Sequence, residues 1–171
     1  MRSSAALDGQ IQAEQTGGEV ERPEFGPLLQ SLGFLLRMSQ LASFEDFFAH
    51  RQELELGPGE LSLLLFLANN PGIRQGVVGQ HLMIKRAHMT KKVRAMEEAG
   101  LILRSIPDDD RRSVELRLSP QGDALALRLT PAFEAYEALP KGPLSSTEEA
   151  ELKRLLRKFA GLDSYLAEDG Q

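Results

Sequence analysis

The chain has 171 residues, of which 42% are hydrophobic and 26% charged, and its formal net charge is −5. This composition is typical of a globular protein that buries a core, and it excludes the low-hydrophobicity class of disordered chains. The absence of cysteine excludes disulfide scaffolds, thiol nucleophiles and thiolate metal sites.

The first predicted elements are a tail and a long helix. Residues 1–24 are polar without a sustained period, and we expect a disordered acidic tail. From Pro27 to Arg51, apolar side chains recur mostly at steps of three and four residues. This spacing predicts one long helix with a broad apolar face.

Two shorter helices are predicted next. Pro58 suits the first turn of a helix that continues from Glu60 to Asn69. This helix is apolar nearly all round, so we expect it to be central and buried. The sequence Asn-Pro-Gly at residues 70–72 ends it, and a short helical stretch is expected at residues 75–82.

A basic helix follows in this acidic chain. Residues 85–94, KRAHMTKKVR, carry five Lys or Arg and no acid. Met89, Val93 and Met96 nevertheless recur at helical spacing, and Gly100 is placed to end a helix that begins near Arg86. We expect these three residues to pack inward and the polar side chains Arg86, His88, Lys91 and Lys92 to lie largely off the packed face.

Two strands and two helices complete the chain. Residues 101–106 and 113–118 each alternate in hydrophobicity, and the charged turn PDDDRR joins them, which predicts a hairpin rather than a sheet domain. A helix is expected from Ser119-Pro120 to about Ala138. The last helix is expected to be capped by Ser145 or Ser146, to run to about Ala167, and to carry a clean apolar stripe.

This order of helix, short helix, basic helix and hairpin is typical of a winged helix-turn-helix. We therefore predict a mainly α fold with a small β-hairpin wing, in which residues 56–119 form the winged helix-turn-helix. From His81 to Arg117 there are nine basic and six acidic residues, a local charge of +3, whereas the rest of the chain carries −8. An acidic body would confine DNA to this basic face.

A helix fits the major groove, where arginine reads guanine and lysine contacts phosphates, and arginines at a wing tip suit the narrow minor groove. The predicted DNA contacts are Lys85, Arg86, His88, Lys91, Lys92, Asp110, Arg111 and Arg112. One alternative is that the basic run is only a solvated helix face. Another is a winged helix that serves as a protein-interaction module and grips an acidic partner.

The stretch from Leu56 to Gly122 resembles the MarR family of winged-helix transcriptional regulators. The resemblance rests on GLILRSIPDDDRRSVELRLSPQG, in which an Asp-x-Arg element precedes Leu-Ser-x-x-Gly. It implies a homodimer that places two recognition helices in successive major grooves of a near-palindromic double-stranded operator. By position, Asp110 would brace the wing arginine Arg112. The family's helix usually opens with Ser or Thr, and Lys85 to His88 stand there instead, which predicts a weaker helix cap.

We assign residues 25–55 and 120–171 to dimerisation helices, because their apolar stripes exceed what a monomer core of this size needs. Packing within one chain is the alternative. The predicted interface residues are Leu28, Leu32, Leu152, Leu155, Leu156, Phe159 and Leu162.

The resemblance also implies a repressor that a small aromatic or phenolic carboxylate or an acyl thioester releases from DNA. An arginine beside apolar walls suits such an organic anion. The candidate ligand residues are Arg37, Met38, Leu41, Phe44, Phe48, Leu63 and Phe66; alternatively, they are ordinary core and interface residues.

Other functions find little support in the sequence. The longest apolar run, residues 63–68, is far shorter than the roughly 20 residues of a membrane span. No signal-peptide pattern is visible, so we expect a cytoplasmic protein with no membrane partner. His81 and His88 lack the carboxylates of a metal site, and no phosphate-binding loop or nucleophile elbow is found. We expect no enzyme activity, metal or cofactor.

Overall fold

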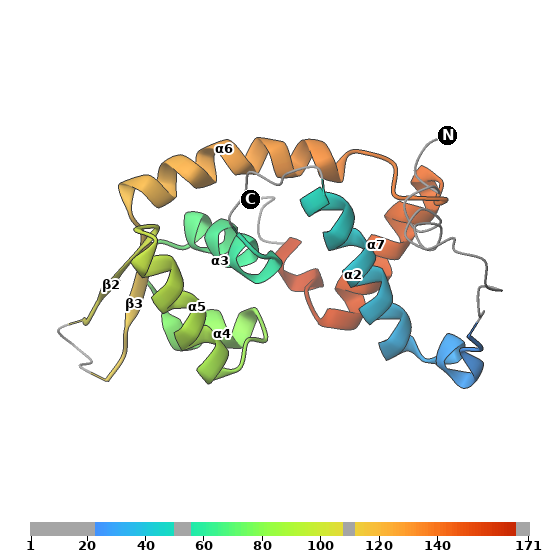
Figure 1. Cartoon of the computed structure of the whole chain (residues 1–171), viewed down its shortest axis with the longest axis horizontal. Helices are drawn as coiled ribbons and strands as arrows, with labels where there is room; N and C mark the ends of the chain where they lie inside the picture. Colours follow the sequence, from blue (N-terminus) through green and yellow to red (C-terminus); the bar gives the residue numbers. More distant parts are fainter. Residues whose placement is uncertain (1–22, 50–55, 108–111, 167–171) are drawn as a thin grey trace, which may run out of the picture. The chain divides into compact units, whose positions relative to one another are not determined.

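The computed structural model describes residues 23–49, 56–107 and 112–166. Most of the expected tail and the wing-tip residues Asp110 and Arg111 therefore lie outside the described residues. The chain divides into two compact units, Phe25–Tyr136 and a second unit that includes residues 137–166 (Figure 1). Of the helices that are described, none is both long and apolar enough to cross a membrane.

The first unit begins with a short 3-10 helix, η1 (Gly26–Gln30), and α2 (Leu32–Ala49). The prediction of one unbroken helix is wrong at Ser31, whose ψ of 111° is extended. The Ser31 hydroxyl accepts a hydrogen bond from the Phe34 amide at 3.4 Å. Because serine satisfies free amides at a helix start, the chain begins a new helix there.

The C-terminal end of α2 is attached to α6 (Pro120–Glu137). The ring of Phe47, the one buried residue of α2, lies 4.9 Å from that of Tyr136. The Tyr136 hydroxyl donates to Asp46 Oδ2 at 2.9 Å and lies 3.1 Å from the Ser43 carbonyl oxygen. Apolar side chains nearer the start of α2 remain exposed.

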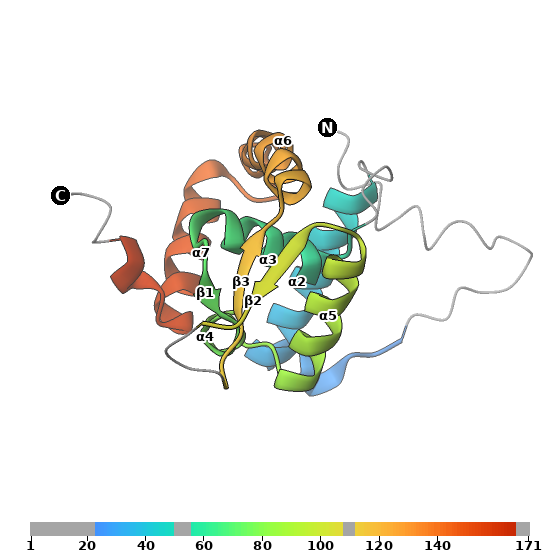
Figure 2. The same ribbon diagram turned by 90° about the vertical axis from the view of Figure 1, so that its left-hand side faces the viewer.

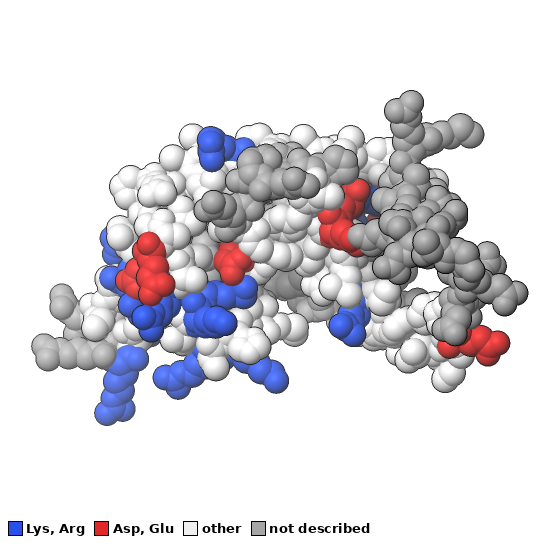
Figure 3. Space-filling model, viewed as in Figure 1, with Lys and Arg blue, Asp and Glu red and all other residues white. Residues whose placement is uncertain are grey.

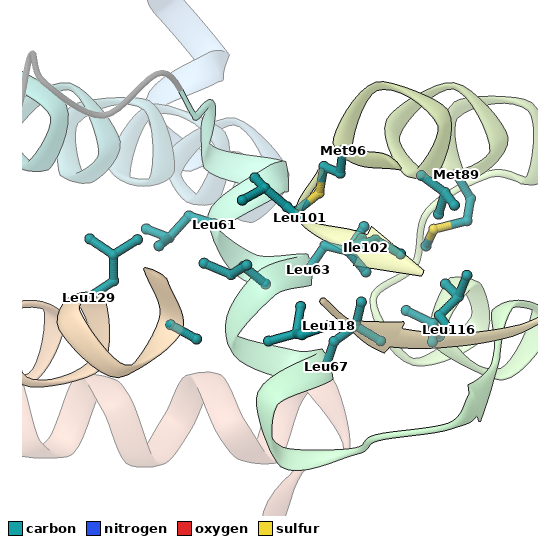
Figure 4. Close-up of a cluster of buried hydrophobic side chains, with 14 of the residues drawn as sticks. Leu61, Leu63, Leu67, Met89, Met96, Leu101, Ile102, Leu116, Leu118 and Leu129 are labelled. Carbon is teal, nitrogen blue, oxygen red and sulfur yellow. The ribbon is translucent and has the colours of Figure 1, made fainter. Parts of the chain in front are cut away.

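The core forms around α3 (Pro58–Asn69), which confirms the predicted buried helix. Its leucines pack against side chains from α5 (Arg86–Glu98), the sheet and α6 (Figure 4). The side chains that are essentially inaccessible to solvent are Leu63, Leu64, Leu67, Val78, Met89, Val93, Met96, Ile102 and Leu116.

The predicted hairpin is present, but the sheet has a third strand that the sequence analysis missed. Strands β2 (Ile102–Ser105) and β3 (Glu115–Leu118) pair antiparallel, and β1 (Ile73–Arg74) pairs with the other side of β3 (Figure 2). The Gly72 amide donates to the Leu116 carbonyl at 2.9 Å and thereby extends the pairing. A strand of two residues is too short to show alternation, which explains the omission.

The helix-turn-helix follows β1. The short helix α4 (Gln75–His81) leads through a three-residue turn and the cap residue Lys85 into α5. Gly100, with φ of +73°, ends α5 as predicted. The amides of Gly100 and Leu101 donate to the carbonyls of Glu97 and Met96, which closes the helix in a Schellman motif.

The junction between the hairpin and α6 explains the Leu-Ser-x-x-Gly motif. The Ser119 hydroxyl donates to the Gly100 carbonyl and accepts from the Gly122 amide at 3.0 Å, so it caps α6. A Cβ at Gly122 would overlap the Leu101 carbonyl oxygen and lie 3.3 Å from the Leu118 Cβ. The motif therefore places a capping serine and a residue without a side chain where α6 crosses the start of β2.

The second unit contains α7 (Ser146–Ala160) and the 3-10 helix η2 (Asp163–Leu166). Ser145 caps α7, as one of the two predicted residues, and forms a capping box with Glu148. The prediction that this helix continues to about Ala167 is wrong, because Gly161 adopts a φ of +70° and ends it. No described residue of α7 is buried.

Candidate nucleic-acid interface

Four of the predicted DNA contacts lie exposed along the first half of α5. Met89, Val93 and Met96 are buried, as predicted, and hold the helix against the core. Four exposed side chains at the start of the helix have no hydrogen-bond or ion-pair partner among the described residues: Lys85, Arg86, His88 and Lys91. Lys85 makes no side-chain cap, which agrees with the weak cap expected from the sequence.

Lys92 is placed differently from the prediction. We expected it to lie off the packed face, but its ammonium lies 3.2 Å from Glu60 Oε1 on α3, and its side chain is only 30% exposed. The reason is helical spacing, because Lys92 follows Met89 by three residues and precedes Met96 by four. That spacing was visible in the sequence.

The hairpin is attached to α5 by a second ion pair. Arg104 on β2 pairs with Glu97 on α5. Arg94, one turn before Glu98, donates to its carboxylate at 2.8 Å, and this hydrogen bond raises the pKa of Arg94. These two arginines therefore have carboxylate partners within the protein.

The described part of the wing includes Arg112 but neither Asp110 nor Arg111. The Arg112 side chain is exposed where the chain approaches β3. The expected contact between Asp110 and Arg112 falls outside the described residues. Arg117 on β3 is also exposed, and its guanidinium lies 3.5 Å from the Ser105 hydroxyl.

Lys and Arg side chains gather over α5 and beside the wing (Figure 3). Two further polar residues of this region were not among the predicted contacts. Thr90 is exposed between His88 and Lys91 and donates to the Arg86 carbonyl at 3.0 Å. Arg74 is exposed on β1, which the sheet places beside the hairpin. Helical spacing pointed to Thr90, whereas nothing local in the sequence pointed to Arg74.

The predicted ligand residues have very different surroundings. Leu63 is a fully buried core side chain, whereas Arg37, Met38 and Leu41 are exposed on α2. The ring centroids of Phe44 and Phe48 are 6.5 Å apart, and Phe66 stacks on His81 with the same distance between ring centroids. A surface hollow of about 360 Å³ in the first unit is lined by none of the seven, but by Leu101, Gln121, Ala124, Leu125 and Arg128.

All seven predicted dimer residues are exposed in the single chain. Leu28 and Leu32 are about half exposed at the start of the first unit, and Phe159 on α7 is 67% exposed. The others, all in the second unit, are Leu152, Leu155, Leu156 and Leu162. Within the described ranges, no group of three or more His, Asp or Glu side chains could hold a metal ion.

Comparisons with known proteins agree with this architecture. The model of the MarR family matches residues 56–114. A putative transcriptional regulatory protein for the hcr operon of Thauera aromatica is 32% identical over 140 residues, which cover 81% of this chain and 84% of that protein. The crystal structure of a probable transcriptional regulator from Pseudomonas aeruginosa is 30% identical, with a TM-score of 0.66 over 77% of this chain and 98% of that one. The transcriptional repressor CouR, solved bound to a 23-mer DNA duplex, is 31% identical, with a TM-score of 0.58 over 88% of this chain and 100% of that one.

Proposed function

The chain belongs to the MarR family of transcriptional regulators, and from that premise we propose that it is a homodimeric repressor that binds a near-palindromic operator through α5 and the wing. One observation carries the proposal. Among the described residues, the exposed side chains of Lys85, Arg86 and Lys91 at the start of α5 have no carboxylate partner. The opposite surface of the helix is buried in the core. A helix held in this way is suited to the major groove.

Each predicted contact other than Lys92 has a chemical role in this proposal. Arg86 is suited to a bidentate hydrogen bond with guanine, and Lys85 and Lys91 to phosphates. His88 and Thr90 lie on the same exposed surface and supply shorter polar contacts. Arg112, together with Arg111 and with Asp110 as its brace, would enter the adjacent minor groove.

Dimerisation doubles the number of phosphate contacts, and the affinity for DNA depends on that number through counterion release. The exposed apolar side chains of η1, α2 and α7 support an interface between two copies of the chain, because isolated exposed leucines are ordinary but a full helical stripe is not. The relative CouR is a repressor bound to duplex DNA, which supports the same kind of partner here.

We place the effector site on α2. Arg37 has no partner among the described residues and lies beside exposed Met38 and, one turn on, Leu41. A guanidinium beside apolar groups suits a small aromatic or phenolic carboxylate or an acyl thioester. If such a ligand releases the operator, Arg37→Ala should raise the ligand concentration needed for release without changing DNA affinity in the absence of ligand.

The decisive experiment is selection of bound genomic fragments by the purified protein at moderate salt. A single enriched palindrome supports the proposed regulator, and Arg112→Ala should then weaken binding to it by about 1–3 kcal/mol while the dimer persists in light scattering. Unchanged affinity would remove the wing from the interface. Diffuse, salt-sensitive binding without an enriched site would instead support the alternative, a winged helix that binds a protein partner.

A further inference from the structure

Lys92 lies within the basic run of α5, yet it is bound to another part of the protein. Its ammonium contacts Glu60 Oε1 at 3.2 Å, and the side chains of the pair are only 30% and 26% exposed. The other oxygen of Glu60 accepts a hydrogen bond from the Gly57 amide at 2.6 Å. One carboxylate therefore caps α3 and holds α5 at the same time.

The backbone of α3 leaves space for this lysine. A Cβ at Gly59 would lie 2.7 Å from Lys92 Nζ and 2.8 Å from its Cε, so any larger residue at this position would displace the end of the lysine. The ammonium thus occupies a place beside the first turn of α3 that only a glycine leaves open. Its charge is paired with the Glu60 carboxylate, and less than a third of its side chain is exposed to solvent.

A second ion pair lies on the other flank of the buried face of α5. Glu97 pairs with Arg104 of β2, and it follows Lys92 by five residues, or about 140° around the helix. The apolar residues Met89, Val93 and Met96 lie between these two positions. Apolar contacts alone tolerate small rotations, whereas two charged contacts on opposite flanks oppose rotation in both directions.

From these contacts we infer that Lys92 is a positioning residue and not a phosphate contact: its ion pair with Glu60 sets the rotation of α5 and thereby decides which side chains reach the DNA bases. This inference rests on the proposed function, since it concerns how specifically α5 reads an operator. Lys91 provides the matched control, because it carries the same charge one residue earlier and is exposed without a partner among the described residues.

The experiment compares Lys92→Met with Lys91→Met by fluorescence anisotropy, on the selected operator and on a scrambled duplex over a range of salt. Lys92→Met should lose about tenfold in operator affinity, the scale of one lost base contact. Its affinity for the scrambled duplex and its salt slope should stay unchanged. Lys91→Met should weaken binding to both duplexes alike. It should also lower the slope of log affinity against log salt concentration by about two, one for each subunit.

Glu60→Gln provides a second, milder variant, because glutamine can still accept from the Gly57 amide while the ion pair is lost. Like Lys92→Met, it should lose its preference for the operator over the scrambled duplex. If circular dichroism shows that Lys92→Met is unfolded, the inference is tested with Glu60→Gln alone. The inference is overturned if Lys92→Met lowers the salt slope as Lys91→Met does, or if operator affinity survives both Lys92→Met and Glu60→Gln. A wild-type protein that does not distinguish the two duplexes refutes the proposed function itself, and the inference with it.

Discussion

Gly122→Ala tests how closely α6 approaches the start of the hairpin. Gly122 lies in the first turn of α6, where alanine would ordinarily favour the helix by about 1 kcal/mol. Here the added methyl group would overlap the Leu101 carbonyl oxygen, 3.1 Å from its carbonyl carbon and 3.3 Å from the Leu118 Cβ. The overlap involves backbone atoms, which cannot turn away as a side chain can.

The expected cost follows from three contributions. Overpacking a tight site typically costs about 1–3 kcal/mol. Movement of α6 would also weaken the hydrogen bond from the Ser119 amide to the Leu101 carbonyl, which contributes about 0.5–1.5 kcal/mol. The helix propensity of alanine offsets about 1 kcal/mol of this sum. The net expectation is a loss of about 2 kcal/mol in the free energy of unfolding.

The assay is urea unfolding followed by far-ultraviolet circular dichroism at one fixed protein concentration, because dimerisation couples stability to concentration. Gly76→Ala is the matched control, since a Cβ at this α4 position would meet no atom within 4 Å. It should leave stability unchanged or raise it by up to about 1 kcal/mol. A Gly122→Ala protein as stable as the wild type would refute the close approach of α6 to Leu101.

Two further predictions concern α7. Replacing both Leu155 and Phe159 with Glu should give folded monomers in light scattering, because charges would stand in the exposed apolar stripe; persistent dimers would exclude this helix from the interface. Hydrogen bonds from the Ser145 side chain and backbone lower the pKa of Glu148, so this interaction stabilises α7 above the ordinary carboxyl pKa and is lost as pH falls through the lowered value. Ser145→Ala should therefore raise the pKa of Glu148 in an NMR titration, and an unchanged value would contradict the capping box.

The sequence predicted well those features that depend on local periodicity. The buried face of α3 and the stripe of Met89, Val93 and Met96 recur in the structure because a helix repeats every 3.6 residues. The end of α5 at Gly100 was predictable because glycine readily adopts the positive φ of a helix C-terminus. Strand alternation located the hairpin in the same way. The break at Ser31 was missed because one capping serine competes with an otherwise continuous apolar pattern.

The site was harder to predict because its geometry depends on contacts that are distant in the sequence. Lys92 and Glu60 are 32 residues apart, so only the folded chain reveals that this lysine is paired. The same holds for Arg74, which β1 places beside the hairpin through pairing with β3. Charge density in the sequence therefore located the basic surface, but it did not distinguish exposed cations from those bound within the protein.

The junction at Ser119 and Gly122 also has a mechanical consequence. The 18 residues of α6 correspond to a rod about 27 Å long, with one end held at the hairpin and Tyr136 near the other. If the rod turns rigidly about the junction, a displacement of about 1 Å at its far end rotates the hairpin end by only about 2°. A small displacement at the Tyr136 end would therefore change the orientation of the hairpin end very little. To rotate the hairpin end noticeably, the far end of α6 would have to move by several ångströms.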